Sequence, residues 1–144
     1  MYDDIGLLEY IYQSAKIGQE TIFHILELKL EVDEVNSILK NILLNYKKIA
    51  LSAKTMLERR NKKIKEIGML SQMLTYMSVK INVSIEENNK DILNIVYQNS
   101  RQGVDEITIK LREFNIKSKS IINLAQRYIK FEQDNLDKIR EYLI

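Results

Sequence analysis

The sequence contains no cysteine and no proline, and glycine occurs at only four of its 144 positions. Without cysteine, the chain forms no disulfide, holds no Cys-ligated metal and has no thiol nucleophile. All-β and alternating β/α folds need more turn-forming residues than four glycines supply. The scarcity of turn residues therefore predicts an all-α protein.

Long apolar runs and a strong charge of one sign are also missing. No run approaches the ~18 residues of a membrane-spanning helix. The opening "MYDDIGLLEY" is acidic, unlike the basic start of a signal peptide. A formal net charge of +2 does not favour nucleic acid as a main partner. We therefore expect a cytoplasmic protein with no integral membrane segment and no nucleic-acid partner.

Apolar residues recur at steps of three and four along almost the whole chain, which is the period of amphipathic helices. A single helical domain over residues 1–144 is expected, with Asp3 or Asp4 capping the first helix and Asp33 the second. The expected helices cover residues 3–30, 33–63, 69–85, 90–114 and 118–144.

A phrase occurs twice in the sequence. "YQSAKIGQE" begins at Tyr12 and "YQNSRQGVDE" begins at Tyr97, 85 residues later. A weaker echo relates Tyr46 and its apolar neighbours to Tyr128 and its own. The pattern predicts two αα-hairpin repeats, residues 3–63 and 90–144, joined by a short crossover helix at 69–85. Two such hairpins can bury their apolar stripes against each other in a four-helix bundle.

The doubled phrase puts a glycine inside two of the expected helices, at Gly18 and Gly103. An interior glycine costs a helix about 0.8–1.0 kcal/mol relative to alanine, so a packing reason is expected. Both glycines have small neighbours, Ser14 and Asn99 among them. We predict that the first and fourth helices cross tightly at these four residues.

The candidate metal ligands are weak. Glu20, His24 and Glu27 fall on the outer face of the first helix by a 100° count, and the matching Asp105 also falls outward. Such a surface group lacks the inward-converging ligands of a catalytic metal site. No glycine-rich phosphate loop is present, and a lone histidine gives no basis for a Ser/His/Asp triad. We expect neither a catalytic site nor a cofactor.

One acid faces inward. In the last helix, Glu132 and Asn135 lie within the apolar stripe, and a buried glutamate needs a partner. A tyrosine hydroxyl or a lysine is the ordinary partner. A ligand, which would make Glu132 part of a functional site, is the alternative.

Two surfaces could take a partner. The crossover helix is rich in apolar residues, Met69, Met73, Tyr76 and Met77 among them. They form a face packed on the bundle or a surface for a protein partner or self-association, for which methionine is well suited. A membrane-surface helix is a third alternative, although the segment lacks the dense basic face of that class. The basic residues from Arg59 to Lys65 lie at the expected end of the second helix, where basic residues stabilise the helix dipole. Binding of nucleic acid or an anionic membrane is the alternative role for them.

With "YIYQSAKIG", "MLTYMSVKINV", "YQNSRQGVDEITIKL" and "KFEQDNLDKIREYL" together, the chain resembles small ferritin-like helical proteins of Gram-positive spore-forming bacteria. The resemblance spans nearly the whole chain and implies a ferritin-like four-helix bundle with a crossover helix. It implies no activity, and the metal ligands of ferritin-like enzymes have no matching positions here.

The leading expectation is a non-enzymatic bundle that acts through protein contacts, as a homodimer or with an unidentified protein partner. The first alternative is a degenerate ferritin-like protein that binds metal or a small ligand in the bundle core near Glu132. The second is a binder of nucleic acid or membrane surfaces through the basic end of the second helix.

Overall fold

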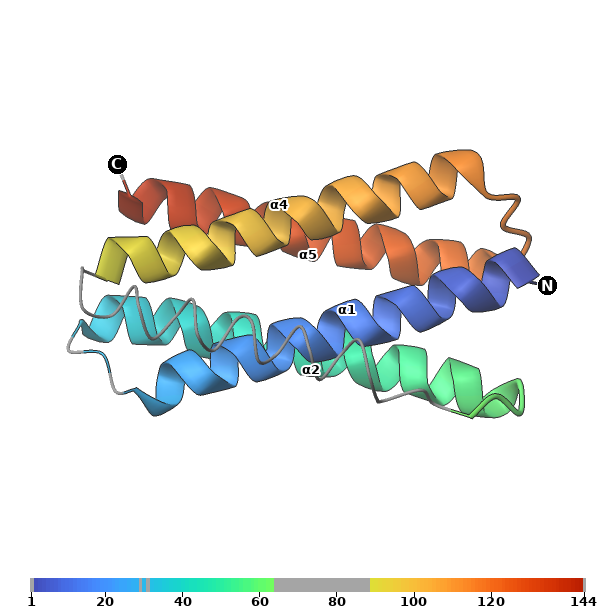
Figure 1. Cartoon of the computed structure of the whole chain (residues 1–144), viewed down its shortest axis with the longest axis horizontal. Helices are drawn as coiled ribbons and strands as arrows, with labels where there is room; N and C mark the ends of the chain where they lie inside the picture. Colours follow the sequence, from blue (N-terminus) through green and yellow to red (C-terminus); the bar gives the residue numbers. More distant parts are fainter. Residues whose placement is uncertain (1, 29, 31, 64–88, 144) are drawn as a thin grey trace.

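The computed structural model describes residues 2–28, 30, 32–63 and 89–143, and these residues form four α-helices and no strand. The helices are α1 (Tyr2–Glu27), α2 (Asp33–Arg59), α4 (Asn89–Glu113) and α5 (Lys119–Leu143) (Figure 1). All four begin within about one residue of their expected starts, and α1 and α2 end three or four residues earlier than expected. The crossover helix expected at 69–85 lies outside the described residues.

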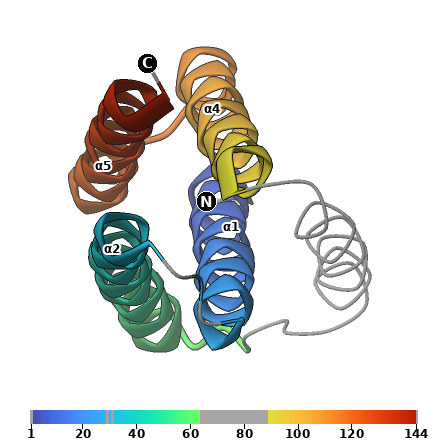
Figure 2. The same cartoon turned by 90° about the vertical axis from the view of Figure 1, so that its left-hand side faces the viewer.

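The four helices form an all-α bundle, as the periodicity predicted. Seen end-on, α1 lies beside α2 and α4, and α5 completes the square beside α2 and α4 (Figure 2). The most extensive contacts lie within the pairs α1–α2 and α4–α5, which are consecutive helices of the described chain. The bundle is therefore built from two hairpins whose apolar faces meet.

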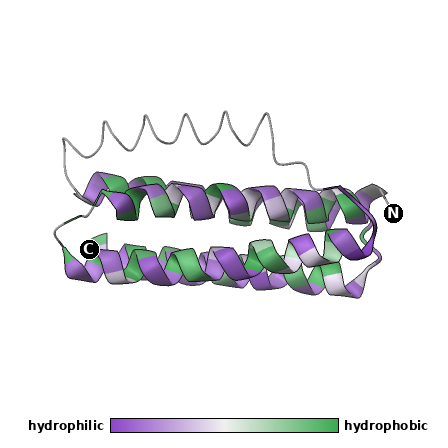
Figure 3. Ribbon diagram, turned by 90° about the horizontal axis from the view of Figure 1, so that it is seen from below, coloured by the Kyte–Doolittle hydropathy of each residue, from purple (hydrophilic) through white to green (hydrophobic). Residues whose placement is uncertain are grey.

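The core follows the apolar stripes. Hydrophobic and hydrophilic residues alternate around each helix (Figure 3), and this alternation lets one face pack inward. The α5 stripe is the one predicted, including both polar members. Its buried residues are Ile121, Leu124, Ala125, Tyr128, Glu132, Asn135 and Ile139.

The first turn of α1 binds a distant part of the chain. Asp4 accepts hydrogen bonds from the backbone N–H groups of Lys117 (2.9 Å) and Ser118 (3.0 Å), and Asp3 accepts one from Asn115 (3.1 Å). These three donors lie in the α4–α5 connection, beside the N-terminus in Figure 1. The aspartates were expected to cap their own helix. Instead they accept hydrogen bonds from backbone N–H groups of the segment that leads into α5.

The electrostatics of Asp4 agree with this role. Burial raises the pKa of its carboxyl, whereas the N–H donors of Lys117 and Ser118 lower it, and the resulting pKa lies below its ordinary value. The charged form of Asp4 is therefore favoured by the fold.

The expected cap of α2 is also corrected. Val32, in an extended conformation, is the N-cap residue and makes no side-chain cap hydrogen bond, while Asp33 is the first residue of the helix. There its charge lies near the positive end of the helix dipole. The cap position is thus one residue earlier than the sequence suggested.

The other end of α2 is fixed by Arg60 and Asn61. Arg60 donates to the carbonyl of Met56 (3.1 Å) and to the hydroxyl of Ser118 at the start of α5 (3.3 Å). Asn61 has φ of 56°, a left-handed conformation common just beyond a helix C-terminus. These contacts support the helix-terminus interpretation of this basic stretch. Among the described helices, none is long and apolar enough to cross a membrane.

We predict that Asp4→Asn destabilises the fold by about 1–2 kcal/mol. Both carboxylate oxygens of Asp4 accept a charge-assisted hydrogen bond, whereas asparagine is neutral and has one acceptor oxygen. Asp3→Asn is the matched control and should cost less, since Asp3 receives a single, exposed hydrogen bond. Urea unfolding at neutral pH measures both values.

The same interaction should weaken in acid. A carboxyl whose pKa is lowered by folding stabilises the fold above its ordinary pKa, and this contribution disappears as pH falls through the folded-state pKa. The difference between the parent and Asp4→Asn should therefore shrink below about pH 4. An equal difference at pH 7 and in acid would contradict the assigned role.

Candidate functional site

The buried carboxylate of Glu132 lies at the centre of the bundle. Glu132 and Asn135 are only 1% and 2% exposed, which confirms that both face inward. The Tyr46 hydroxyl donates toward both carboxylate oxygens at 2.9 Å, and Asn135 Nδ2 donates to Oε1 at 2.9 Å. Tyr46 is a residue of α2, so the tyrosine partner expected from the sequence links α2 to α5.

Burial raises the pKa of the Glu132 carboxyl from an ordinary 4.5 to about 7, because the charged form loses its hydration inside the bundle. Hydrogen bonds from Tyr46 and Asn135, and the nearby hydroxyls of Ser100 and Tyr128, oppose this rise. The pKa of Glu132 therefore lies close to neutral pH.

The partners of Glu132 are all neutral. No lysine or arginine of the described chain forms an ion pair with it; the ion pairs found there are Lys16–Glu20 and Arg140–Asp137. A buried charge without a counter-ion is unfavourable even when hydrogen bonds satisfy some of its lone pairs. Ionised Glu132 is therefore hydrogen-bonded but lacks charge compensation.

Aromatic rings surround the carboxylate. The Tyr46 ring packs edge-on against Phe131, with centroids 4.9 Å apart, and lies 6.4 Å from the Tyr128 ring. Burial and then the charge of Glu132 raise the pKa of Tyr46 and Tyr128 well above the usual tyrosine value. Both hydroxyls therefore stay protonated at any ordinary pH.

Gly18 and Gly103 make room for this cluster. A Cβ at Gly18 would lie 2.5–2.8 Å from ring atoms of Tyr46, and one at Gly103 would lie 3.1 Å from Glu132 Oε2. Atoms of Tyr128 are the next nearest to Gly103, at 3.5 and 3.7 Å. The close approach is therefore between each glycine and side chains of α2 or α5, and not the crossing of α1 and α4 backbones that we predicted.

A pocket opens between α1 and α4 at the same place. Its volume is about 240 Å³, and both glycines and the carboxylate line it. The predicted crossing residues Ser14 and Asn99 lie in its walls. The described residues that line it are Tyr10, Gln13, Ser14, Ile17, Gly18, Tyr46, Asn99, Gln102, Gly103, Glu106, Tyr128 and Glu132.

Hydroxyl groups extend the polar floor of this pocket, which we call the α1–α4 pocket. Ser14 Oγ lies 2.7 Å from the Tyr128 hydroxyl, so α1 and α5 are bonded across the cavity. Ser100 Oγ is fully buried and makes no hydrogen bond of ordinary geometry with the described residues. Polar groups from all four helices thus lie at or near one carboxylate.

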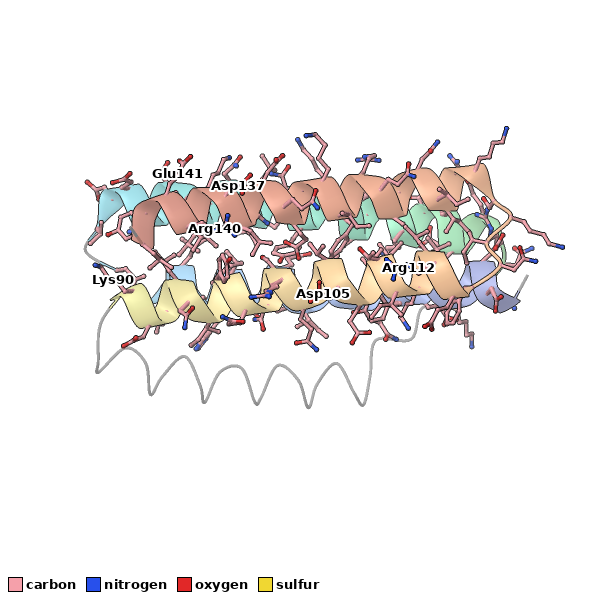
Figure 4. The ribbon with its side chains drawn as sticks, turned by 90° about the horizontal axis from the view of Figure 1, so that it is seen from above. Lys90, Asp105, Arg112, Asp137, Arg140 and Glu141 are labelled. Carbon is pink, nitrogen blue, oxygen red and sulfur yellow. The ribbon has the colours of Figure 1, made fainter. Side chains whose placement is uncertain are left out.

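The other metal candidates are elsewhere. Glu20 pairs with Lys16 at 3.8 Å on the outside of α1, and Glu27 and Asp105 are exposed. Figure 4 labels Asp105 on α4, together with charged residues at the two ends of that helix. His24 is half-buried on α1. The described part of the chain contains no group of three or more His, Asp or Glu side chains arranged for a metal ion.

Sequence reasoning missed the pocket and several of its walls. Tyr10, Gln13, Gln102 and Glu106 were not among the predicted site residues, and neither was Ile17. The available signal was the pair of glycines: two missing side chains at equivalent places in two helices leave space that another group must fill or leave open. The predicted interaction surface (Met69, Met73, Tyr76 and Met77) lies outside the described residues.

Gly18→Ala should destabilise the protein, although alanine is the better helix former. Its methyl group would press on the buried Tyr46 ring, and overpacking of this kind costs about 1–3 kcal/mol. Gly6→Ala is the matched control, because nothing lies within 4 Å of its Cβ position. The control should gain up to about 1 kcal/mol. Thermal melts that rank Gly18→Ala above the parent would refute the packing role.

Glu132→Gln should remove a pH dependence of stability between pH 4.5 and about 7. Because folding raises this pKa, the folded protein holds the proton more tightly, so the parent loses stability as pH rises through this window. A rise from 4.5 to about 7 corresponds to about 3 kcal/mol at about 1.36 kcal/mol per pKa unit.

Urea unfolding of the parent and of Glu132→Gln at about pH 4 and about pH 8 measures this effect. The free energy of unfolding of the parent, relative to the variant, should fall by about 3 kcal/mol between the two conditions. Identical pH dependence in both proteins would show that Glu132 titrates as an ordinary surface acid.

Comparison of the chain with protein-family models, with curated proteins and with solved structures gives no match in any of the three. Function must therefore be inferred from the site itself.

Proposed function

We propose that the protein is a small-molecule-binding helical bundle, whose ligand enters the α1–α4 pocket and is anchored by Glu132. One observation carries the proposal: a buried carboxylate that has no counter-ion among the described residues lies in the wall of a cavity between two helices. A structural glutamate alone would explain its hydrogen bonds to Tyr46 and Asn135. It would not explain why the described residues leave a cavity of about 240 Å³ beside it.

The dimensions favour a small ligand. A volume of about 240 Å³ is far more than one ordered water requires, since a water needs only ~10–15 Å³. It is slightly below the ~300–1,000 Å³ of pockets for drug-sized molecules. The walls combine aromatic rings with amide, hydroxyl and carboxylate groups, a mixture typical of sites that orient a small polar molecule.

The proposal corresponds to the small-ligand alternative drawn from the sequence. The ferritin-like assignment and the internal duplication stay proposals. The duplication is supported by the placement of Gly18 against Tyr46 and of Gly103 near Tyr128, since these tyrosines are paired in the sequence echo. Self-association also stays a prediction, because its surface lies outside the described residues.

A fragment screen by two-dimensional NMR tests the proposed function. A set of neutral, cationic and anionic fragments of four to eight non-hydrogen atoms is titrated into isotope-labelled protein. At least one fragment should shift the amide signals of Ser14, Gly18 and Gly103 in a saturable way, because these residues lie along the cavity. The α2–α5 groove near Lys48 and Lys130 provides an internal comparison on another face.

Absence of saturable shifts at the pocket for every fragment would reject the proposed function. Shifts confined to the α2–α5 groove would reject it as well, because they would locate binding on a different surface.

A further inference from the structure

We propose that the α1–α4 pocket takes a small organic cation carrying N–H donors, such as a primary ammonium or a guanidinium ion, with the Glu132 carboxylate as its counter-ion. The inference rests on the proposed function, since it names the class of ligand for the same pocket.

The charge of the pocket walls supports a cation. The described lining residues include two carboxylates, Glu106 and Glu132, and neither lysine nor arginine. The second groove, between α2 and α5, has the opposite character, with Lys48, Arg127, Lys130 and Lys138 against the single acid Asp134. Two cavities of similar size therefore differ in sign, and the pocket next to the buried acid is the negative one.

The net charges of the helices show the same difference between the two sides of the bundle. Helix α1 contains five acidic residues and one lysine, a net charge of −4, and α4 has four acids and four bases. In contrast, α2 and α5 carry net charges of +2 and +1. The negative charge of α1, on one side of the cleft, raises the local concentration of cations and their rate of entry.

The geometry of Glu132 leaves one oxygen available. Oε1 accepts from both Asn135 and Tyr46, whereas Tyr46 is the one described residue that donates to Oε2 with ordinary hydrogen-bond geometry. The hydroxyls of Ser100 and Tyr128 also lie near the carboxylate. A Cβ atom at Gly103 would lie 3.1 Å from Oε2. A glycine at this place thus keeps Oε2 uncovered on the α4 side, where a donor from a ligand can reach it.

The remaining walls suit N–H donors. Amide and hydroxyl groups of Gln102, Asn99 and Ser14 offer acceptor oxygens, and a tyrosine ring attracts a cation placed over its face. Tyr10 already makes such a cation–π contact within the chain, because Lys110 Nζ lies 4.8 Å from its ring centroid.

Binding should be coupled to the proton on Glu132. The titratable and charged groups around the carboxylate are Tyr10 and Lys110 at the rim, Tyr46, Tyr128 and Glu106. Burial raises the pKa of all three tyrosines, so they remain neutral. A cation favours ionised Glu132, whose proton then passes to solvent. Affinity should therefore fall roughly tenfold per pH unit below about 7.

The test uses four probes on the full chain at constant ionic strength: n-propylammonium, guanidinium, 1-propanol and propionate. We expect the two cations to shift the pocket amides in a saturable way at pH 8, and to bind at least tenfold more tightly than 1-propanol or propionate. Glu132→Gln should weaken n-propylammonium binding tenfold or more. Glu141→Gln, which removes the same charge from an exposed position on α5, should leave it unchanged.

Gly103→Ala provides a second test of cation binding if Glu132→Gln folds poorly. Its methyl group would partly cover Oε2 and should weaken cation binding several-fold without removing the charge. Circular dichroism and a melting curve establish that each variant is folded before titration.

The outcomes separate the two proposals. If 1-propanol or propionate binds the pocket as tightly as n-propylammonium, or if Glu132→Gln and Glu141→Gln behave alike, the cation inference is overturned while the pocket remains a binding site. If none of the four probes shifts the pocket amides, the cation inference is also overturned. The proposed function itself fails only if the wider fragment screen is negative too.

Discussion

Burying one carboxylate in the middle of a helical bundle constrains everything around it. Inside the core, Glu132 loses its hydration, and only hydrogen-bond donors fixed by packing can replace it. The main donor is the Tyr46 hydroxyl, and its ring reaches the carboxylate because Gly18 has no side chain in the way. Residues on α1, α2 and α5 are thus linked by the need to hydrogen-bond one buried carboxylate.

The way this requirement is met differs from a buried salt bridge. An arginine or lysine partner would hold the carboxylate ionised and would fill the adjacent space with a long side chain. Neutral donors leave both charge states accessible near neutral pH and leave the cavity open. Neutral hydrogen bonding therefore stabilises the core and still permits another molecule to supply the missing charge.

Features fixed by local periodicity could be predicted from the sequence, whereas features fixed by contacts between helices could not. The α5 stripe, including Glu132 and Asn135, was predicted correctly because helical periodicity alone fixes which residues share a face. The contacts of Gly18 and Gly103 were not, because the group that fills a missing side chain's space depends on how the neighbouring helix is rotated. The pocket was missed for the same reason: it exists only when residues of all four helices are assembled.

The hydrogen bonds of Asp3 and Asp4 to the α4–α5 connection join residues 112 to 114 positions apart in sequence. During synthesis, the first helix leaves the ribosome long before these backbone partners exist. The α1–α2 pair can form early from contacts close in sequence, but the first turn of α1 gains its fixed partners only after the second hairpin has emerged. Such distant contacts close a large loop and form late. The first hairpin can therefore fold during translation, before the hydrogen bonds that join its first turn to the second hairpin are able to form.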